Sequence, residues 1–271
     1  MDYRQHDVSE ELKPFVKCFW SLEAPASPQS EKQRIVPDGC MEMIFHYGDL
    51  YQQFYEDGRN IIQPRCFVFG QITSPLEIAP TGVSGIIAAR FHPDGFIPFT
   101  SLPIQQMENK AVPLKDLFGD DTDDFEKRVC AASSSEERIK YISDFLIARL
   151  QTIEAAHRIT KTSIETLLQS KGQINLDELA GQLQVNRRQL ERKFSAAIGL
   201  SPKQFSKVIR LQATLKMLEQ KKFTSLTSLA YENGYYDQAH FIKDFKEFTG
   251  VSPKEFYAGH LQMSALFAAA G

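Results

Sequence analysis

A short phrase near the C-terminus occurs twice and constrains the fold more than any other feature. Residues 199–205 read GLSPKQF and residues 250–256 read GVSPKEF, at an offset of 51. The residues before each copy match too, since Leu190 and Phe194 correspond to Phe241 and Phe245 at the same offset. A segment repeated at a fixed period is typical of a supersecondary unit that is present more than once. We therefore expect this region to fold as two similar units.

Helix signals divide the first unit, at about residues 175–198, into two short helices. Asn175 is a suitable N-cap, and Leu176 and Leu179 begin an apolar face behind it. Asn186 is an N-cap for a second helix, which Gly199 ends. Two helices joined by a tight turn predict a helix-turn-helix motif.

The second unit, at about residues 225–249, repeats this pattern. Ser225 caps the first helix and Gly234 breaks it. Asp237 then caps a helix that stops at Gly250. The second helix of each unit is the one that a helix-turn-helix protein places in the DNA major groove.

Several polar or small side chains are expected on the outer faces of the two recognition helices. Arginine can bond a guanine edge, glutamine an adenine edge, and an alkyl group can contact a thymine methyl. The predicted base-reading residues are Arg187, Arg188, Glu191, Arg192, Gln238, Ala239, Ile242 and Lys243.

Residues from about 174 to 256 resemble the DNA-binding domain of the AraC/XylS transcription regulators. The motif residues that carry the resemblance are Ala230, Gly234-Tyr235, Asp237-Gln238, His240-Phe241, Phe245-Lys246 and Gly250-Val251-Ser252-Pro253. Tyr235, Asp244 and Tyr257 depart from the usual pattern. The resemblance implies a sequence-specific regulator of transcription that binds double-stranded DNA. It allows RNA polymerase and a small-molecule effector as further partners, and leaves open whether the protein is a monomer or a homodimer.

A long helix is expected between the two units, and basic residues lie along it. Ser201-Pro202 combines an N-cap with proline at the first helical position, and no breaker follows until about residue 218. Seventeen or so residues give a helix of roughly 25 Å, so one monomer could read two successive major-groove segments. The predicted phosphate contacts are Ser201, Lys203, Lys207, Arg210, His240, Ser252 and Lys254.

Charge differs between the two halves of the chain. Residues 1–155 hold 15 Lys and Arg against 24 Asp and Glu, whereas residues 156–271 hold 16 against 10. The net charges of −9 and +6 recover the total of −3. An acidic first domain over residues 1–155, a basic DNA-binding domain over residues 156–260 and a tail over residues 261–271 are therefore predicted.

The sequence of the first domain is typical of a small β structure. Aromatic and β-branched runs at residues 15–22, 41–47, 66–72, 76–79 and 85–91 are separated by turn residues such as Pro37-Asp38-Gly39. Helices are expected at 123–132 and 136–150. The phrase at residues 36–45 and Arg90-Phe91-His92-Pro93 resemble one branch of the AraC/XylS sensor domains. The predicted class is α+β multidomain: a small β-barrel-like (cupin-like) domain followed by an all-α domain.

Trp20, Phe45, Phe69 and Phe91 are candidates for an effector pocket, with plain core as the alternative. His46 and His92 with Glu42 could in principle hold a divalent metal, and Cys40 with Cys66 could form a redox pair. Core or turn roles are favoured for all of these, so no metal or cofactor is predicted.

No Walker, dinucleotide-binding or nucleophile-elbow motif occurs, so the chain is not expected to be an enzyme. The alternatives are a DNA-binding protein whose first domain is a metal- or redox-dependent sensor or enzyme, and an architectural DNA binder without a ligand. The polar N-terminus lacks an apolar leader, and the widely spaced cysteines suggest reduced thiols, so a cytoplasmic location is expected.

Overall fold

The computed structural model describes residues 1–27, 32–150, 157–220 and 223–258. Contacts divide the chain into two units. The first comprises residues 1–32, 40–71 and 78–155, and the second comprises residues 33–39, 72–77 and 156–271. The predicted boundary at 151–155 and the predicted tail at 261–271 lie outside the described residues.

The described strands form two open sheets. The larger has the order β1-β2-β9-β4-β7-β10 and the smaller the order β3-β8-β5-β6. The strands are β1 (Asp2–His6), β2 (Val16–Ala24), β3 (Gln33–Ile35), β4 (Glu42–His46), β5 (Tyr51–Phe54), β6 (Asn60–Ile62), β7 (Cys66–Phe69), β8 (Leu76–Pro80), β9 (Ser84–Phe91) and β10 (Ala111–Pro113). Each of the five strands expected from the sequence is present.

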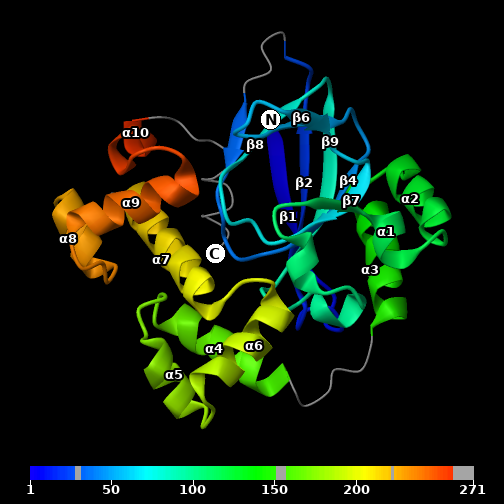
Figure 1. Cartoon of the computed structure of the whole chain (residues 1–271). Helices are drawn as coiled ribbons and strands as arrows, with labels where there is room; N and C mark the ends of the chain where they lie inside the picture. The colour runs from blue at the N-terminus through cyan, green and yellow to red at the C-terminus, as the bar shows by residue number, and fades with distance from the viewer. Residues whose placement is uncertain (28–31, 151–156, 221–222, 259–271) are drawn as a thin grey trace. The chain divides into compact units, whose positions relative to one another are not determined.

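The mixed α+β class is confirmed, but the described sheets do not close into the expected barrel. Helices cover the apolar face of the larger sheet, which removes the need for closure. They are α1 (Leu114–Phe118), α2 (Thr122–Ala131) and α3 (Ser135–Arg149). Figure 1 shows them along one side of the sheet. Leu114, Val129 and Ile142 join strand residues in one buried cluster, and short 3-10 turns at Ile97–Phe99 and Ile104–Met107 precede β10.

Strand register assigns the predicted effector-pocket residues to opposite faces of the larger sheet. Phe45 and Phe91 lie on the face that packs in the cluster with α2 and α3. Trp20 is opposite Ala88, and Phe69 is opposite Glu42 across β4 and β7, which places both on the other face. The four side chains therefore do not line a common cavity, and all are buried. The alternating strand pattern could not distinguish a pocket from two cores.

In the second unit, α4 (His157–Gln169) precedes the two helix pairs. The pairs are α5 (Leu176–Gln182) with α6 (Arg187–Ile198), and α8 (Leu226–Glu232) with α9 (Gln238–Thr249). Helix α7 (Pro202–Glu219) joins them, and α10 (Pro253–Ala258) follows. Figure 1 shows α7 running from the α4–α6 group to the α8–α9 group.

Helix α7 contributes to two separate cores through different side chains. Phe205 and Ile209 pack with residues of α4, α5 and α6. Val208, Leu211 and Leu215 pack with residues of α8 and α9, where Val36 also lies. Both helix pairs are thus held against one rigid helix of 18 residues, which is about 27 Å long.

Candidate nucleic-acid interface

The N-termini of the helices in both pairs are built by the caps expected from the sequence. Asn186 Oδ1 accepts a hydrogen bond of 2.8 Å from Gln189 N at the start of α6. Asp237 Oδ1 accepts one of 2.7 Å from His240 N at the start of α9. Gly199 and Gly250 end these two helices in the left-handed conformation, at φ of 83° and 74°, which glycine adopts without strain.

The three arginines of α6 differ in their surroundings. Arg187 NH1 lies 3.3 Å from Asp177 Oδ2, and Arg187 Nε lies 3.0 Å from Glu191 Oε1. These contacts raise the pKa of Arg187, chiefly through the hydrogen bond to Glu191. Arg188 and Arg192 are exposed and make no ion pair within the described ranges. Of the predicted readers on α6, these two are available to a ligand without breaking a contact.

On α9, the predicted readers are also unequal. Gln238 Oε1 accepts a hydrogen bond of 2.8 Å from Thr227 Oγ1, which orients the amide group. Ala239 and Lys243 are exposed. Ile242 is only partly exposed and packs against the core of the second helix pair, so less of its surface is available for a thymine methyl.

Lys207 is held in an ion pair within the protein. Its Nζ lies 3.0 Å from Asp244 Oδ1 and 3.3 Å from Glu247 Oε2. Asp244 is only 2% exposed, so this carboxylate on α9 points into the unit and not outward. His240 Nε2 lies 3.5 Å from its other oxygen. Burial is the largest single influence on the pKa of Lys207 and lowers it, but the hydrogen bonds and charges of Asp244 and Glu247 together raise this pKa above its ordinary value.

Arg210 is also occupied inside the second unit. Its NH2 donates a hydrogen bond of 2.9 Å to Gly172 O, and its guanidinium lies 5.1 Å from the centre of the Tyr235 ring. Tyr235, which departs from the family pattern, is thereby buried against a cation. The sequence assigned Lys207 and Arg210 to phosphate, but both make intramolecular contacts that a sequence pattern cannot reveal.

The remaining phosphate candidates lie at helix starts. Ser201 Oγ accepts a hydrogen bond of 3.2 Å from Gln204 N in a capping box, and Ser252 Oγ accepts one of 3.3 Å from Glu255 N. Lys203 and Lys254 are exposed one turn or less from these caps. The side chain of Tyr257 lies outside the described residues.

Two exposed aromatic residues were missed by the sequence analysis. Tyr231 is 60% exposed on α8, and Tyr236 is 86% exposed immediately before the cap of α9. Tyrosine hydroxyl groups commonly contact phosphate oxygens. The position of Tyr236 could have identified it from the sequence. It lies in the turn before a recognition helix, where a large aromatic side chain cannot pack into the core.

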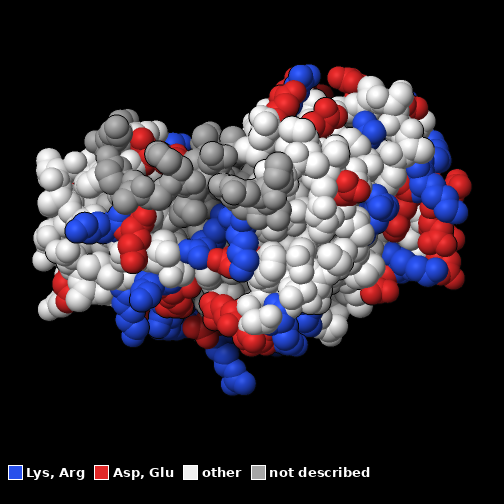
Figure 2. Space-filling view, turned by 90° about the horizontal axis from the view of Figure 1, so that it is seen from above, with Lys and Arg blue, Asp and Glu red and all other residues white. Residues whose placement is uncertain are grey.

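Charges of both signs are interspersed on the surface shown in Figure 2. The basic excess of the C-terminal half therefore does not stand out as one uniform patch on that face.

Comparison with known proteins gives two family matches. Residues 179–259 match a helix-turn-helix domain family, and residues 4–113 match a domain of unknown function (DUF6597). Every described residue of α6 and α9 lies inside the first match.

The curated relatives match about a third of the chain. An uncharacterized HTH-type transcriptional regulator from Haemophilus influenzae is 32% identical over 99 residues, 36% of this chain and 33% of the relative. The HTH-type transcriptional regulator GbdR from Pseudomonas aeruginosa is 35% identical over 82 residues, 30% of this chain and 22% of the relative. The chain thus spans a third or less of the length of these relatives.

Among solved structures, ToxT from Vibrio cholerae is similar, with a TM-score of 0.47 and 13% identity. The alignment covers 89% of this chain and 98% of that chain. In the described part of the chain, no helix has the length and apolar character needed to cross a membrane.

Proposed function

From the AraC-type helix-turn-helix domain that the C-terminal residues form, we propose that this chain is a sequence-specific DNA-binding regulator of transcription. The observation that carries the proposal is the pair Arg188 and Arg192 on α6. They lie four residues apart and so share one helix face. Both are exposed, and neither is engaged by an acid in the described ranges. Such a pair fits bidentate contacts to guanine edges.

The second helix pair supplies a weaker set of readers. Gln238 is oriented by Thr227, and an oriented amide suits the edge of an adenine. Lys243 is exposed beside Ala239. We therefore assign the larger share of sequence discrimination to α6 and a smaller share to α9.

Backbone contacts to DNA are assigned to groups that are not already used inside the protein. Lys203 and Lys254 are exposed near the starts of α7 and α10, and Tyr236 precedes α9. Such contacts set the position of the protein on the duplex without reading bases. Lys207 and Arg210 are left out of this set because they hold Asp244 and Gly172.

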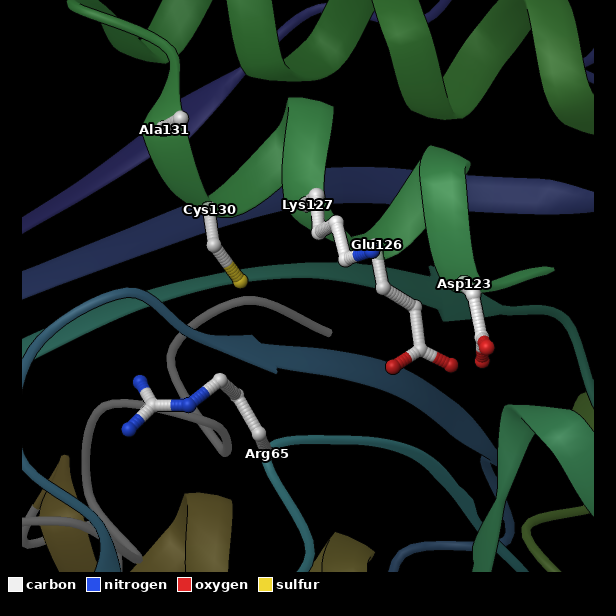
Figure 3. Close-up of a pocket in the computed structure, with 6 residues that line it drawn as sticks. All are labelled: Arg65, Asp123, Glu126, Lys127, Cys130 and Ala131. Atoms are coloured by element: carbon white, nitrogen blue, oxygen red, sulfur yellow. The ribbon is translucent and has the colours of Figure 1, made fainter.

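We assign effector binding to the first unit, where a cavity of about 710 Å³ lies. Its volume is in the range of small-molecule sites. Figure 3 shows the six lining residues, which include both signs of charge: Arg65, Asp123, Glu126, Lys127, Cys130 and Ala131. A ligand with both donor and acceptor groups would suit this lining.

Selection of binding sites from a randomised duplex pool by the full chain tests the DNA-binding proposal. The expected result is an enriched motif with guanines at fixed positions. Loss of guanine preference in Arg188→Ala and Arg192→Ala, with Arg187→Ala as the matched control, would support the assignment to α6. Recovery of no motif by the wild-type protein would refute sequence-specific binding.

A further inference from the structure

Two cysteines far apart in the sequence meet beneath the cavity of the first unit. Cys66 begins β7 and Cys130 lies in the last turn of α2. Their Sγ atoms are 3.8 Å apart, within hydrogen-bonding distance for sulfur and too far for a disulfide bond. The pair is held by the packing of α2 on the larger sheet, because both residues belong to the same apolar cluster. Both cysteines are present as free thiols.

The two thiols differ in access. Cys130 lines the cavity and is partly exposed, whereas Cys66 is 3% exposed and is not among the lining residues. Figure 3 shows Cys130 on α2 in the same row as Glu126 and Asp123, with Arg65 facing this helix. A reagent that enters the cavity therefore meets Cys130 first and reaches Cys66 only through it.

The surroundings of the two thiols also separate their pKa values. Arg65 NH1 donates to His46 O at 2.7 Å and to Gly48 O at 3.0 Å, which fixes the guanidinium. Cys130 Sγ also lies 3.8 Å from His46 O. The pKa of the Cys130 thiol is lowered, first by the hydrogen bond from Cys66 and then by Arg65. The pKa of Cys66 is raised by its neighbour Cys130 and by burial.

We propose that Cys130 and Cys66 are a modification site at which a hydroperoxide converts the two thiols to a disulfide that ties α2 to β7. The Cys130 thiolate attacks the peroxide oxygen, the O–O bond breaks, and water or an alcohol leaves after proton transfer. Cys130 is then a sulfenic acid. The sulfur of Cys66 attacks the sulfur of Cys130, the S–O bond breaks, and the Cys66 proton leaves with the hydroxyl group as water. Two thiols are oxidised and one peroxide is reduced.

Glu126 is placed to assist the second step. Its side chain lines the same cavity as Cys130, and burial raises the pKa of Glu126. A carboxylate with a raised pKa is a better proton acceptor for a thiol than an ordinary one. Closing the bond requires the sulfurs to approach to about 2.05 Å, which needs side-chain rotation at the end of α2.

This site replaces the Cys40 and Cys66 pair that the sequence raised as an alternative. Cys66 has its thiol partner on α2, because the register of β7 turns its side chain toward the helices. The ordinary alternative for such a pair is two inert core thiols. The exposure of Cys130 to the cavity and the nearby Arg65 favour a reactive pair over two inert core thiols. The inference concerns the first unit alone and stands whether or not the chain binds DNA.

Oxidation of the full-length protein by hydrogen peroxide, followed by alkylation and peptide mass spectrometry, tests the proposal. In the wild type, Cys130 is expected to react at least about threefold faster than Cys18 and Cys40, and to end in a peptide crosslinked to Cys66. This measurement needs no variant, so it stands even where a substitution at the buried Cys66 prevents folding.

Variants then assign the roles. Cys66→Ser should leave a sulfenic acid at Cys130 that a cyclic diketone traps, and Cys130→Ser should abolish the crosslink. Cys40→Ser is the matched control and should leave the crosslink unchanged. Oxidation of Cys130 at the rate of Cys18 and Cys40, or a Cys66 crosslink that persists in Cys130→Ser, would overturn the proposal.

Discussion

At the scale of single residues, the arginines of α6 are distinguished by their partners and not by their exposure alone. Arg187 is 50% exposed yet is shared between Asp177 and Glu191. Arg188 and Arg192 carry no such restraint in the described ranges. The sequence pattern placed all of them on the outer face but could not assign these ion pairs.

Arg192→Ala is expected to weaken binding to the selected duplex by about 1–3 kcal/mol and to relax preference at one or two base pairs. Arg187→Ala should change affinity less, because the arginine must first leave its acidic partners. Titration of labelled duplexes with single base changes measures both. Equal weakening of all duplexes by Arg192→Ala would reassign this residue to a phosphate.

Lys207 and Asp244 give a prediction about stability. Asp244 is buried with Lys207 as its nearest cation at 3.0 Å. Removing one partner of a buried pair leaves an uncompensated charge, so Lys207→Met should destabilise the second unit by roughly 3 kcal/mol. The double variant Lys207→Met/Asp244→Leu should recover much of this loss. Thermal unfolding measures both variants, and an unchanged midpoint for Lys207→Met would return Lys207 to the set of phosphate contacts.

His46 predicts a pH dependence of the first unit. The ring is 1% exposed and stacks on Tyr51 at 5.3 Å. Burial lowers the pKa of His46 to about 4, which nearby Gln63 opposes only partly. The unfolded chain, with a pKa near 6.5, then binds more protons than the native state as pH falls below about 6.5. Stability is therefore expected to be full at pH 7 and to fall by about 3 kcal/mol as pH decreases toward 4.

Denaturant unfolding at several pH values checks this expectation, with His46→Phe as the comparison because phenylalanine retains the stacking. The variant should lose the part of the pH dependence that lies between about 6.5 and 4. A slope in this window that is identical in both proteins would assign it to other groups.

At the scale of elements, the caps were the most predictable feature and the edges of the sheets the least. Asn186, Ser201, Ser225 and Asp237 each accept the hydrogen bond that their sequence context predicted. Strands β1, β3, β5, β6 and β10 were missed. Three of them, β3, β6 and β10, have only three residues each, and none of these three is fully buried. Their formation depends on partner strands distant in sequence.

Ser201 allows its two assigned roles to be separated. It caps α7 through Gln204, and it is also a candidate phosphate contact. Ser201→Ala should cost about 1 kcal/mol of stability by loss of the cap. Ser201→Asp retains a good cap but adds a negative charge, so stability should be maintained while DNA affinity falls. If affinity of the aspartate variant equals that of the wild type, Ser201 serves only as a cap.

At the scale of the whole molecule, the basic half of the chain predicts a strong effect of salt. If four phosphates are neutralised, the slope of log affinity against log salt is about −3.6, and affinity falls about 100-fold between roughly 50 and 200 mM salt. Titration of the full chain with its selected duplex measures the slope. A flat dependence would contradict the electrostatic contribution, and Lys203→Ala should make the slope less steep by about one unit.

The grouping of residues 33–39 with the C-terminal helices has a consequence for recombination. Val36 is 4% exposed in the core with α8 and α9, and Gln212 Nε2 donates to Pro37 O at 2.7 Å. A single crossover near residue 155 therefore cannot exchange the helix pairs between genes as a complete unit, because residues 33–39 would stay behind. A chimera joined there would carry a C-terminal half with a cavity the size of a valine side chain, costing about 1–3 kcal/mol, unless its new N-terminal half supplied an equivalent peptide. Among shuffled genes, stable products are expected mainly when residues 33–39 and the C-terminal helices come from the same parent.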